Sequence, residues 1–260
     1  MADLAAVAGR ALRVTAREPE VVVPALLVPA FLFLMMVAAL SDFAEAAGVP
    51  DYKAFQLPVA VIFAVTGVSR ASSLVLDIQG GYFDRMLLTP VNRLALLLGL
   101  MVADFFIVAA LAVPCIGLAV ALGVDFATGV AGILVFLFVA GAWAVAFNGF
   151  SYAIALKTGN PAAVSSAYLL FFPFTFLSTT LAPEDALADW LATAADYNPV
   201  TYLLAGLRSV VHGWDGEALG EAAGSIVAVG AVAIALALLA LQGRARRPGA
   251  SDLSPRSQLA

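Results

Sequence analysis

Long apolar runs, separated by short groups of charged and polar residues, occupy most of this chain. A helix needs about 20 consecutive apolar residues to cross the core of a lipid bilayer. The second run is interrupted by Arg70 and the third contains Asp104, whereas the other runs carry no charge. The pattern predicts an all-α integral membrane protein with six transmembrane helices, within residues 21–40, 54–76, 94–124, 126–156, 158–183 and 222–243.

The composition narrows the class of protein further. Hydrophobic residues make up 63% of the chain and charged residues 12%, whereas a soluble domain is roughly 45–50% apolar and about 25% charged. A water-soluble enzyme is therefore excluded, and the lipid bilayer is the expected surroundings of the chain. The net charge of −5, with Lys53 and Lys157 as the only lysines, argues against a nucleic-acid partner.

The basic residues gather on one side of the predicted membrane helices. Six crossings return the chain to its starting side, so both termini share that side. Cytoplasmic segments of membrane proteins carry an excess of Lys and Arg, and the opposite side keeps only Lys53 and Arg208. The pattern predicts a multi-pass protein with both termini in the cytoplasm, where the basic residues are Arg10, Arg13, Arg17, Arg70, Arg85, Arg93, Lys157, Arg244, Arg246, Arg247 and Arg256.

Residues 1–20 precede the first span and have a helical periodicity of their own. Apolar side chains recur on one face, and Arg10, Arg13 and Arg17 lie on the adjoining face. This predicts a basic amphipathic helix along the cytoplasmic interface, which serves as a membrane anchor, a contact surface for a cytosolic partner, or both. The chain thus divides into this connecting helix, a membrane domain at 21–243, and a basic tail at 244–260 that is expected to be disordered.

Two short helices are predicted on the outer side, between the fifth and sixth spans. Pro183 followed by Glu184 is typical of a helix start, because proline suits the first turn and acids suit the positive end of the helix dipole. Asn198 before Pro199 predicts a second start, and Gly213 is placed to end that helix. Neither piece is long enough to span a membrane, so a pair dipping partly into the outer leaflet fits better than an ordinary surface loop.

The cytoplasmic connection between the second and third spans differs from a simple polar linker. Glycines, an Asp-Arg pair and a Thr-Pro stop surround an apolar patch at helical spacing. A short helix with such a patch must bury it, either against the protein's own spans or, as we favour, against another protein. The residues that carry this docking prediction are Gly81, Tyr82, Phe83, Asp84, Arg85, Leu87, Pro90 and Arg93.

The sequence predicts no catalytic residue, no metal site and no bound cofactor on this chain. A P-loop requires Gly-Lys-Ser/Thr, and neither lysine follows a glycine. Zinc peptidase motifs need two histidines, and His212 is the only one. The charged residues within the spans, Arg70 and Asp104, are too few for an ion relay; Arg70 either snorkels to the cytoplasmic boundary or pairs with Asp104 to orient the loop.

A family resemblance follows from motifs along nearly the whole chain, from about residue 10 to 243. The loop pattern resembles ABC transporter permeases of the type-2 exporter class, and it looks closest to the daunorubicin-resistance permease branch. Arg-Glu-Pro before the first span and several outer positions are similar to the same family. The residues that carry the resemblance are Arg17, Glu18, Pro19, Asp77, Gly81, Asp84, Arg85, Pro90, Arg93, Gly99, Asp104, Ser178, Pro183, Trp190, Asn198, Pro199, Tyr202, Leu207, Arg208 and Gly213.

The resemblance implies a six-span permease in a prokaryotic cell membrane, with a coupling helix after the second span. Two such subunits pair, as a homodimer or a heterodimer, and each engages a cytosolic ATPase subunit that binds ATP and Mg²⁺. The implied function is export of a hydrophobic or amphipathic compound such as a drug, lipid or glycolipid. The alternatives are a non-transporting membrane assembly or anchoring protein for a cytosolic partner, and an ATP-independent secondary transporter.

Phenylalanines crowd two of the predicted spans and are the candidate lining of a transport pathway. A pathway with few charges suits an amphipathic or lipid-like cargo. The other interpretation is that these rings face lipid. The candidate pathway residues are Phe55, Phe63, Phe171, Phe172, Phe174 and Phe176.

Overall fold

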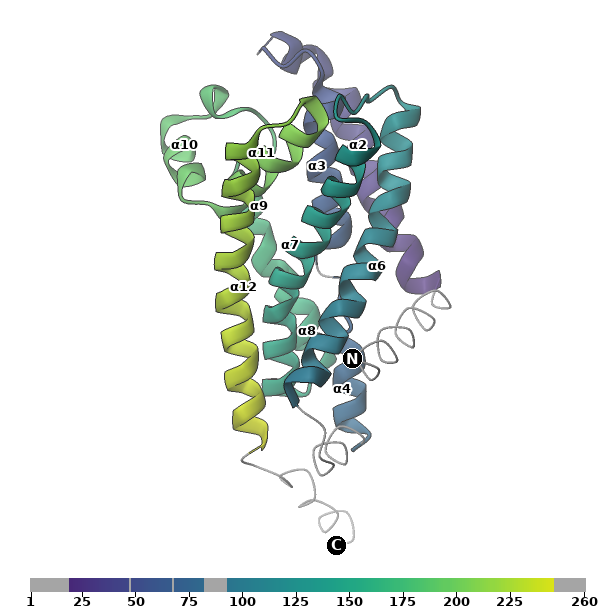
Figure 1. The fold of residues 1–260 in the computed structure, drawn as a ribbon, viewed down its shortest axis with the longest axis vertical. Coiled ribbons are helices and arrows are strands. Elements are labelled where there is room, and N and C mark those ends of the chain that lie inside the picture. Colours follow the sequence, from purple (N-terminus) through teal and green to yellow (C-terminus); the bar gives the residue numbers. More distant parts are fainter. Residues whose placement is uncertain (1–18, 47, 67, 82–92, 246–260) are drawn as a thin grey trace, which may run out of the picture.

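The structure is a computed structural model that describes residues 19–46, 48–66, 68–81 and 93–245, and all regular elements within these ranges are helices (Figure 1). The predicted all-α fold is thus confirmed for these residues. The predicted connecting helix at 1–20 lies outside the described residues except for its last two. In chain order the elements are α2 (Pro19–Ala46), α3 (Tyr52–Val65), α4 (Ala71–Gln79), α6 (Arg93–Ala121), α7 (Gly129–Thr158), α8 (Pro161–Ala167), η1 (Tyr168–Leu170), α9 (Phe171–Phe176), η2 (Glu184–Ala186), α10 (Asp189–Asp196), α11 (Pro199–His212) and α12 (Gly216–Ala245).

Four helices of the described chain are long and apolar enough to cross a membrane: α2, α6, α7 and α12. They match the first, third, fourth and sixth predicted spans. The second predicted span is divided between α3 and α4, and the fifth is divided among α8, η1 and α9. Within the fifth span, Ser178 and Thr180 donate to the carbonyl of Thr175 (2.6 Å each), and such local side-chain bonds compete with helix continuation.

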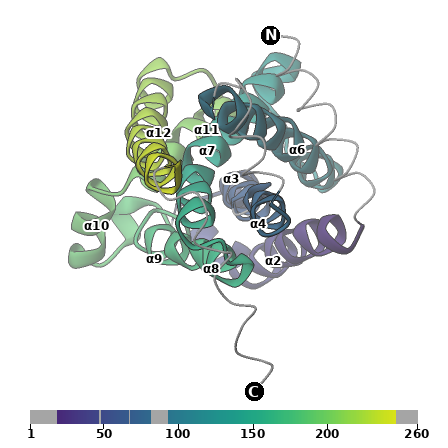
Figure 2. The ribbon, with the colours of Figure 1, turned by 90° about the horizontal axis from the view of Figure 1, so that it is seen from below.

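α7 is the central helix of the bundle. It packs against α12, α6, α11, α8, α4 and α3, and apolar residues are spread around its whole circumference, as expected of a helix enclosed by others. Figure 2 looks along the bundle and shows α7 between α12 on one side and α3 and α4 on the other. α3 is also enclosed: only Lys53 and Phe63 of its 14 residues are not buried.

Most buried apolar side chains of the described chain belong to two large clusters, one towards each end of the bundle, and two smaller clusters hold a few others. The first, here the α11-end core, includes most of α3 and residues such as Phe136, Trp143 and Leu203. The second, the α4-end core, includes α4 and residues such as Met101 and Tyr152. The boundary between the two clusters therefore crosses α6 and α7 at about the middle of each helix.

The predicted short helices before the last long helix are only partly as expected. Asn198 caps α11 through the backbone N–H of Val200 (2.9 Å), and the helix ends at Gly213 as predicted. The predicted start at Pro183 was wrong in extent, because only the single turn η2 forms there and α10 begins at Asp189. Leu187, which follows the turn, is extended (φ −84°, ψ 154°), so the turn does not continue into α10.

Close packing between α7 and α12 depends on Gly149. A methyl group added to Gly149 would lie 2.8 Å from the Cβ of Ala233 and 3.0 Å from its carbonyl carbon. We therefore expect Gly149→Ala to lower the apparent melting temperature in detergent, although alanine is intrinsically favoured over glycine in a helix by about 1 kcal/mol. Gly117→Ala in α6, where nothing lies within 4 Å of the added group, is the matched control and should be neutral or stabilising. Equal melting temperatures for the two variants would contradict this packing.

Candidate functional site

The break between α3 and α4, within the second predicted span, lies inside the helix bundle. α3 ends at Val65, and Thr66 is extended, with φ −72° and ψ 127°. α4 begins only at Ala71, so the helical hydrogen-bond ladder is interrupted between the two helices. Backbone groups freed within a membrane must find partners in the protein, because lipid offers none.

Polar side chains of α6 and α7 supply those partners. Asp104 is 1% exposed and accepts from the backbone N–H of Arg70 through Oδ1 (2.9 Å). Asn148, which is fully buried, donates from Nδ2 to the carbonyl of Val68 (2.8 Å). The indole N–H of Trp143 donates to Oγ1 of Thr66 (3.2 Å). Each side of the break is thus tied to a neighbouring helix.

Asp104 is also the centre of a side-chain cluster. Its Oδ2 accepts from the hydroxyl of Tyr152 (2.8 Å) and from Nδ2 of Asn148 (3.2 Å). The carboxylate lies beside the first turn of α4, where the helix dipole stabilises negative charge. We call Asp104, Asn148 and Tyr152, with the backbone of residues 68 and 70, the polar joint. One alternative from the sequence was a buried charge pair of Asp104 with Arg70; the bond described between these two residues is made by the backbone N–H of Arg70.

The polar joint lies near mid-depth of the bundle. Asp104 follows the start of α6 by 11 residues and Asn148 precedes the end of α7 by 10, which is about 15–17 Å of helix in each case. A bilayer core is about 30 Å thick. An ionisable group at such a depth is a functional candidate, since it is expensive to place there without a role.

A second polar cluster, at the end of the bundle that carries α11, centres on Arg208. Its guanidinium lies 3.5 Å from the ring centre of Phe55 and donates from Nε to the Phe55 carbonyl (3.2 Å). It also donates to the carbonyl (2.7 Å) and the hydroxyl (3.1 Å) of Thr179. Arg208 therefore ties α11 to the start of α3 and to the segment after α9.

The candidate pathway phenylalanines fall into three environments. The ring of Phe55 packs against the guanidinium of Arg208, and Phe171 is fully buried in the α11-end core. Phe63 of α3 contacts the rings of α9, with ring centres 5.6–6.4 Å apart. Its partners are Phe171, Phe172 and Phe176, of which Phe176 is 52% exposed; Phe174 is 49% exposed and has no ring partner in the described chain.

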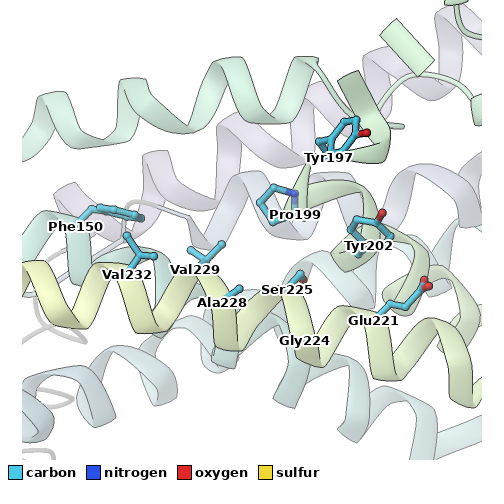
Figure 3. A pocket seen from close by; sticks show the side chains of 10 residues that line it. All are labelled: Phe150, Tyr197, Pro199, Tyr202, Glu221, Gly224, Ser225, Ala228, Val229 and Val232. Atoms are coloured by element: carbon cyan, nitrogen blue, oxygen red, sulfur yellow. The ribbon is translucent and has the colours of Figure 1, made fainter. Parts of the chain in front are cut away.

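A groove along α12 was not predicted from the sequence. It has a volume of about 690 Å³ and is lined by residues of α12, by Phe150 of α7 and by the start of α11 (Figure 3). Tyr197, Tyr202 and Glu221 gather at one end, whereas Phe150 and Val232 lie at the other. The groove thus has a polar, aromatic end and an apolar end, and its volume is that of a drug-sized ligand site.

The residues predicted to dock a partner lie mostly beyond the described ranges. Gly81 lies in the turn that follows α4 and has a positive φ of 69°, a conformation that glycine adopts without strain. Arg93 begins α6. The other docking residues, Tyr82, Phe83, Asp84, Arg85, Leu87 and Pro90, are outside the described residues.

Long apolar helices around mutually bonded, buried polar groups define this chain as an integral membrane protein of the multi-pass class. The sequence matches the ABC-2 type transporter family over residues 3–212. The chain therefore belongs to the ABC-2 type transporter family, as a non-catalytic membrane permease subunit.

A relative with a known name supports the same assignment. The chain is 27% identical, over 219 residues, to the daunorubicin resistance ABC transporter permease protein DrrB1 of Streptomyces coeruleorubidus. The aligned residues cover 79% of this chain and 75% of that protein. The family resemblance drawn from the loop and outer motifs is confirmed, and so is the prediction that the chain itself is not an enzyme.

Proposed function

We propose that this chain is a six-span permease subunit of an ATP-driven exporter that moves a hydrophobic or amphipathic compound out of the cytoplasm or the inner leaflet. The observation that carries the proposal is the match to the ABC-2 type transporter family over residues 3–212. ABC permease subunits act with ATPase subunits, so ATP and Mg²⁺ bind to a partner chain. A second permease subunit, identical or related, completes the assembly.

In this proposal α3 with α4, and α8 with η1 and α9, are the second and fifth crossings. The distribution of basic residues supports placing the α4 end and both termini in the cytoplasm. The connecting helix (1–20) then lies at the inner surface, the permease domain occupies 21–243, and the tail follows from 244. α10 and α11 lie at the outer end.

The topology can be tested with engineered cysteines, because the only native cysteine, Cys115, is buried. Positions 42 and 188 are exposed in the structure and belong to the outer side in the proposal. We expect an impermeant thiol reagent to label cysteines at these two positions in intact cells and to leave a cysteine at position 250 unlabelled until the cells are opened. Labelling of position 250 in sealed cells would refute the proposed orientation.

The proposed ATPase contact is the loop from Gly81 to Arg93, with Phe83 and Leu87 as its apolar anchors. Buried apolar anchors commonly dominate the energy of an interface. We therefore expect Phe83→Ala combined with Leu87→Ala to release the ATPase from detergent-purified complexes, by tenfold or more in recovered ATPase. Leu76→Ala, which alters an exposed residue of α4, is the control and should retain the ATPase. Undiminished recovery with the double variant would show that the loop packs on its own subunit.

Two features support an amphipathic cargo: the groove along α12, and the phenylalanine rings of α3 and α9. A volume of about 690 Å³ with tyrosines and a carboxylate at one end suits a molecule that has both a polar and an apolar part. The phenylalanines between α3 and α9 supply a second apolar surface, and they line the pathway in this proposal.

Transport itself is the direct test. The permease is co-expressed with a candidate ABC ATPase subunit, and daunorubicin, the compound in the name of the relative, is the first fluorescent probe. We expect inside-out vesicles to accumulate the probe only with ATP, and not when the P-loop lysine of the ATPase is replaced by alanine. Accumulation that needs no ATP and is abolished by a protonophore would instead establish a secondary transporter.

A further inference from the structure

The polar joint coincides with the boundary between the two apolar cores. Along α6, Met101 belongs to the α4-end core and Val108 to the α11-end core, and Asp104 lies between them. Along α7, Phe147 belongs to the α11-end core and Tyr152 to the α4-end core, and Asn148 lies between them. The bundle therefore consists of two packed halves with a layer of hydrogen bonds where they meet.

The two parts of the divided span belong to different halves. α3 packs against α2, α6, α7 and α11, whereas α4 packs against α7 and α8. Since no continuous helical ladder joins α3 to α4, the side chains bonded to the residues between them provide a direct connection from α4 to the rest of the bundle, beside the packing of both helices on α7. Asp104 holds the α4 side of this junction through the Arg70 N–H, and Asn148 holds the residue 68 carbonyl.

We infer that Asp104 is a positioning residue of the transport cycle, which keeps α4 in register with the rest of the bundle when the α4-end half moves. The inference rests on the proposed function, because α4 leads through Gly80 and Gly81 to the proposed ATPase contact. Movement of that contact on ATP binding displaces α4, and the carboxylate of Asp104 transmits the displacement to α6 and, through Tyr152 and Asn148, to α7.

The hydrogen bonds of the polar joint can keep α4 attached to α6 and α7 while the α4-end half moves. The carboxyl group of Asp104 accepts from a backbone N–H, a hydroxyl and an amide, so one side chain joins the residue before α4 to two side chains of α7. Asparagine at position 104 keeps the size of the side chain but replaces one acceptor oxygen with an amide that can only donate. It therefore cannot accept from all three donors.

The test measures movement rather than cargo. Spin labels are attached to cysteines at Phe43 near the end of α2 (70% exposed) and at Val130 near the start of α7 (74% exposed), both beyond the joint as seen from α4, with Cys115→Ser as background. In the complex with the ATPase, the distance between the labels is compared without nucleotide and after trapping with ATP and vanadate. We expect the Asp104→Asn complex to retain its ATPase, to keep the label distance measured without nucleotide, and to hydrolyse ATP within twofold of the unmodified complex. The change in label distance on trapping, however, should fall to less than half of that in the unmodified complex.

Two further variants keep the test decisive. Tyr152→Phe removes one donor to Asp104 while it keeps the buried ring, so we expect it to lose less of the distance change than Asp104→Asn. If Asp104→Asn does not insert into the membrane, Tyr152→Phe is used in its place. Asp77→Asn, an acid of α4 outside the joint, should keep the full shift. A full shift in Asp104→Asn, or in Tyr152→Phe if that variant stands alone, overturns the inference. Failure of the unmodified permease to bind the ATPase or to shift refutes the proposed function itself.

Discussion

Replacement of Arg208 by methionine is expected to lower the stability of the permease by on the order of 3 kcal/mol. The guanidinium makes three hydrogen bonds, to the Phe55 carbonyl and to the hydroxyl and carbonyl of Thr179, and it packs on the Phe55 ring. Hydrogen bonds to charged groups contribute about 1.5–3 kcal/mol each, and buried acceptors left without a donor add a penalty. Thermal unfolding of the detergent-purified protein, followed by size-exclusion chromatography, measures the effect.

Two controls separate this role from a general effect of removing positive charge. Lys53 donates to the single carbonyl of Leu122 (2.9 Å) at an exposed site, so Lys53→Met should change the melting temperature little. Arg208→Lys keeps the charge but has no planar fork, and should recover only part of the stability. If Arg208→Met and Lys53→Met proved equally stable, the Arg208 contacts would not hold this end of the bundle together.

Asn198→Ala is the second change from which we expect a large loss of stability. The side chain, 4% exposed, caps α11 through Val200 and also donates to the carbonyls of Phe174 and Leu177. Loss of an N-cap costs about 1 kcal/mol, and each of the two carbonyls left without a donor adds about 1–3 kcal/mol. The expected result is a melting temperature well below that of the unmodified protein in the same detergent.

Asn160 provides a matched control for Asn198, because it also precedes a proline and caps a helix. Its Oδ1 accepts from the N–H of Ala162 (2.9 Å) at an exposed position, and no donation from its side chain amide to another segment is found in the described chain. Asn160→Ala should therefore cost only the cap. Asn198→Asp keeps the oxygen that caps α11 but offers no donor to the two carbonyls, so its melting temperature should be close to that of Asn198→Ala. If Asn198→Asp were instead as stable as the unmodified protein, the proposed role of the amide would be contradicted.

Hydropathy predicts the long helices well, because the length of an uncharged run is a local property of the chain. It does not predict the division of the second span, since the bonds that satisfy the break come from Asp104, Trp143 and Asn148, which lie 34 to 80 residues away from their partners. The sequence contained one signal of this division: Arg70 interrupts the apolar run and Asp104 lies within the next run.

The cap and the buried face of α11 were predictable, whereas the side-chain directions in α9 and α10 were not. The cap at Asn198 and the buried face of α11, formed by Leu203, Leu207 and Val210, follow from spacing and are observed. Trp190 has the spacing of a buried residue but is 68% exposed. α9 holds four phenylalanines in six residues, so hydrophobicity alone cannot distinguish the buried Phe171 from the exposed Phe174. The groove along α12 depends on three helices at once and leaves no periodic signal.

The shortness and enclosure of α3 have a consequence for biogenesis. Its 14 residues make a helix of about 21 Å, which is shorter than the roughly 30 Å core of a bilayer. α3 also carries the buried Gln56, whose amide donates to Tyr52 inside the same helix. Because α3 packs extensively against α2, the two are expected to leave the translocon as a hairpin, so that α2 shields α3 from lipid until the later helices enclose it.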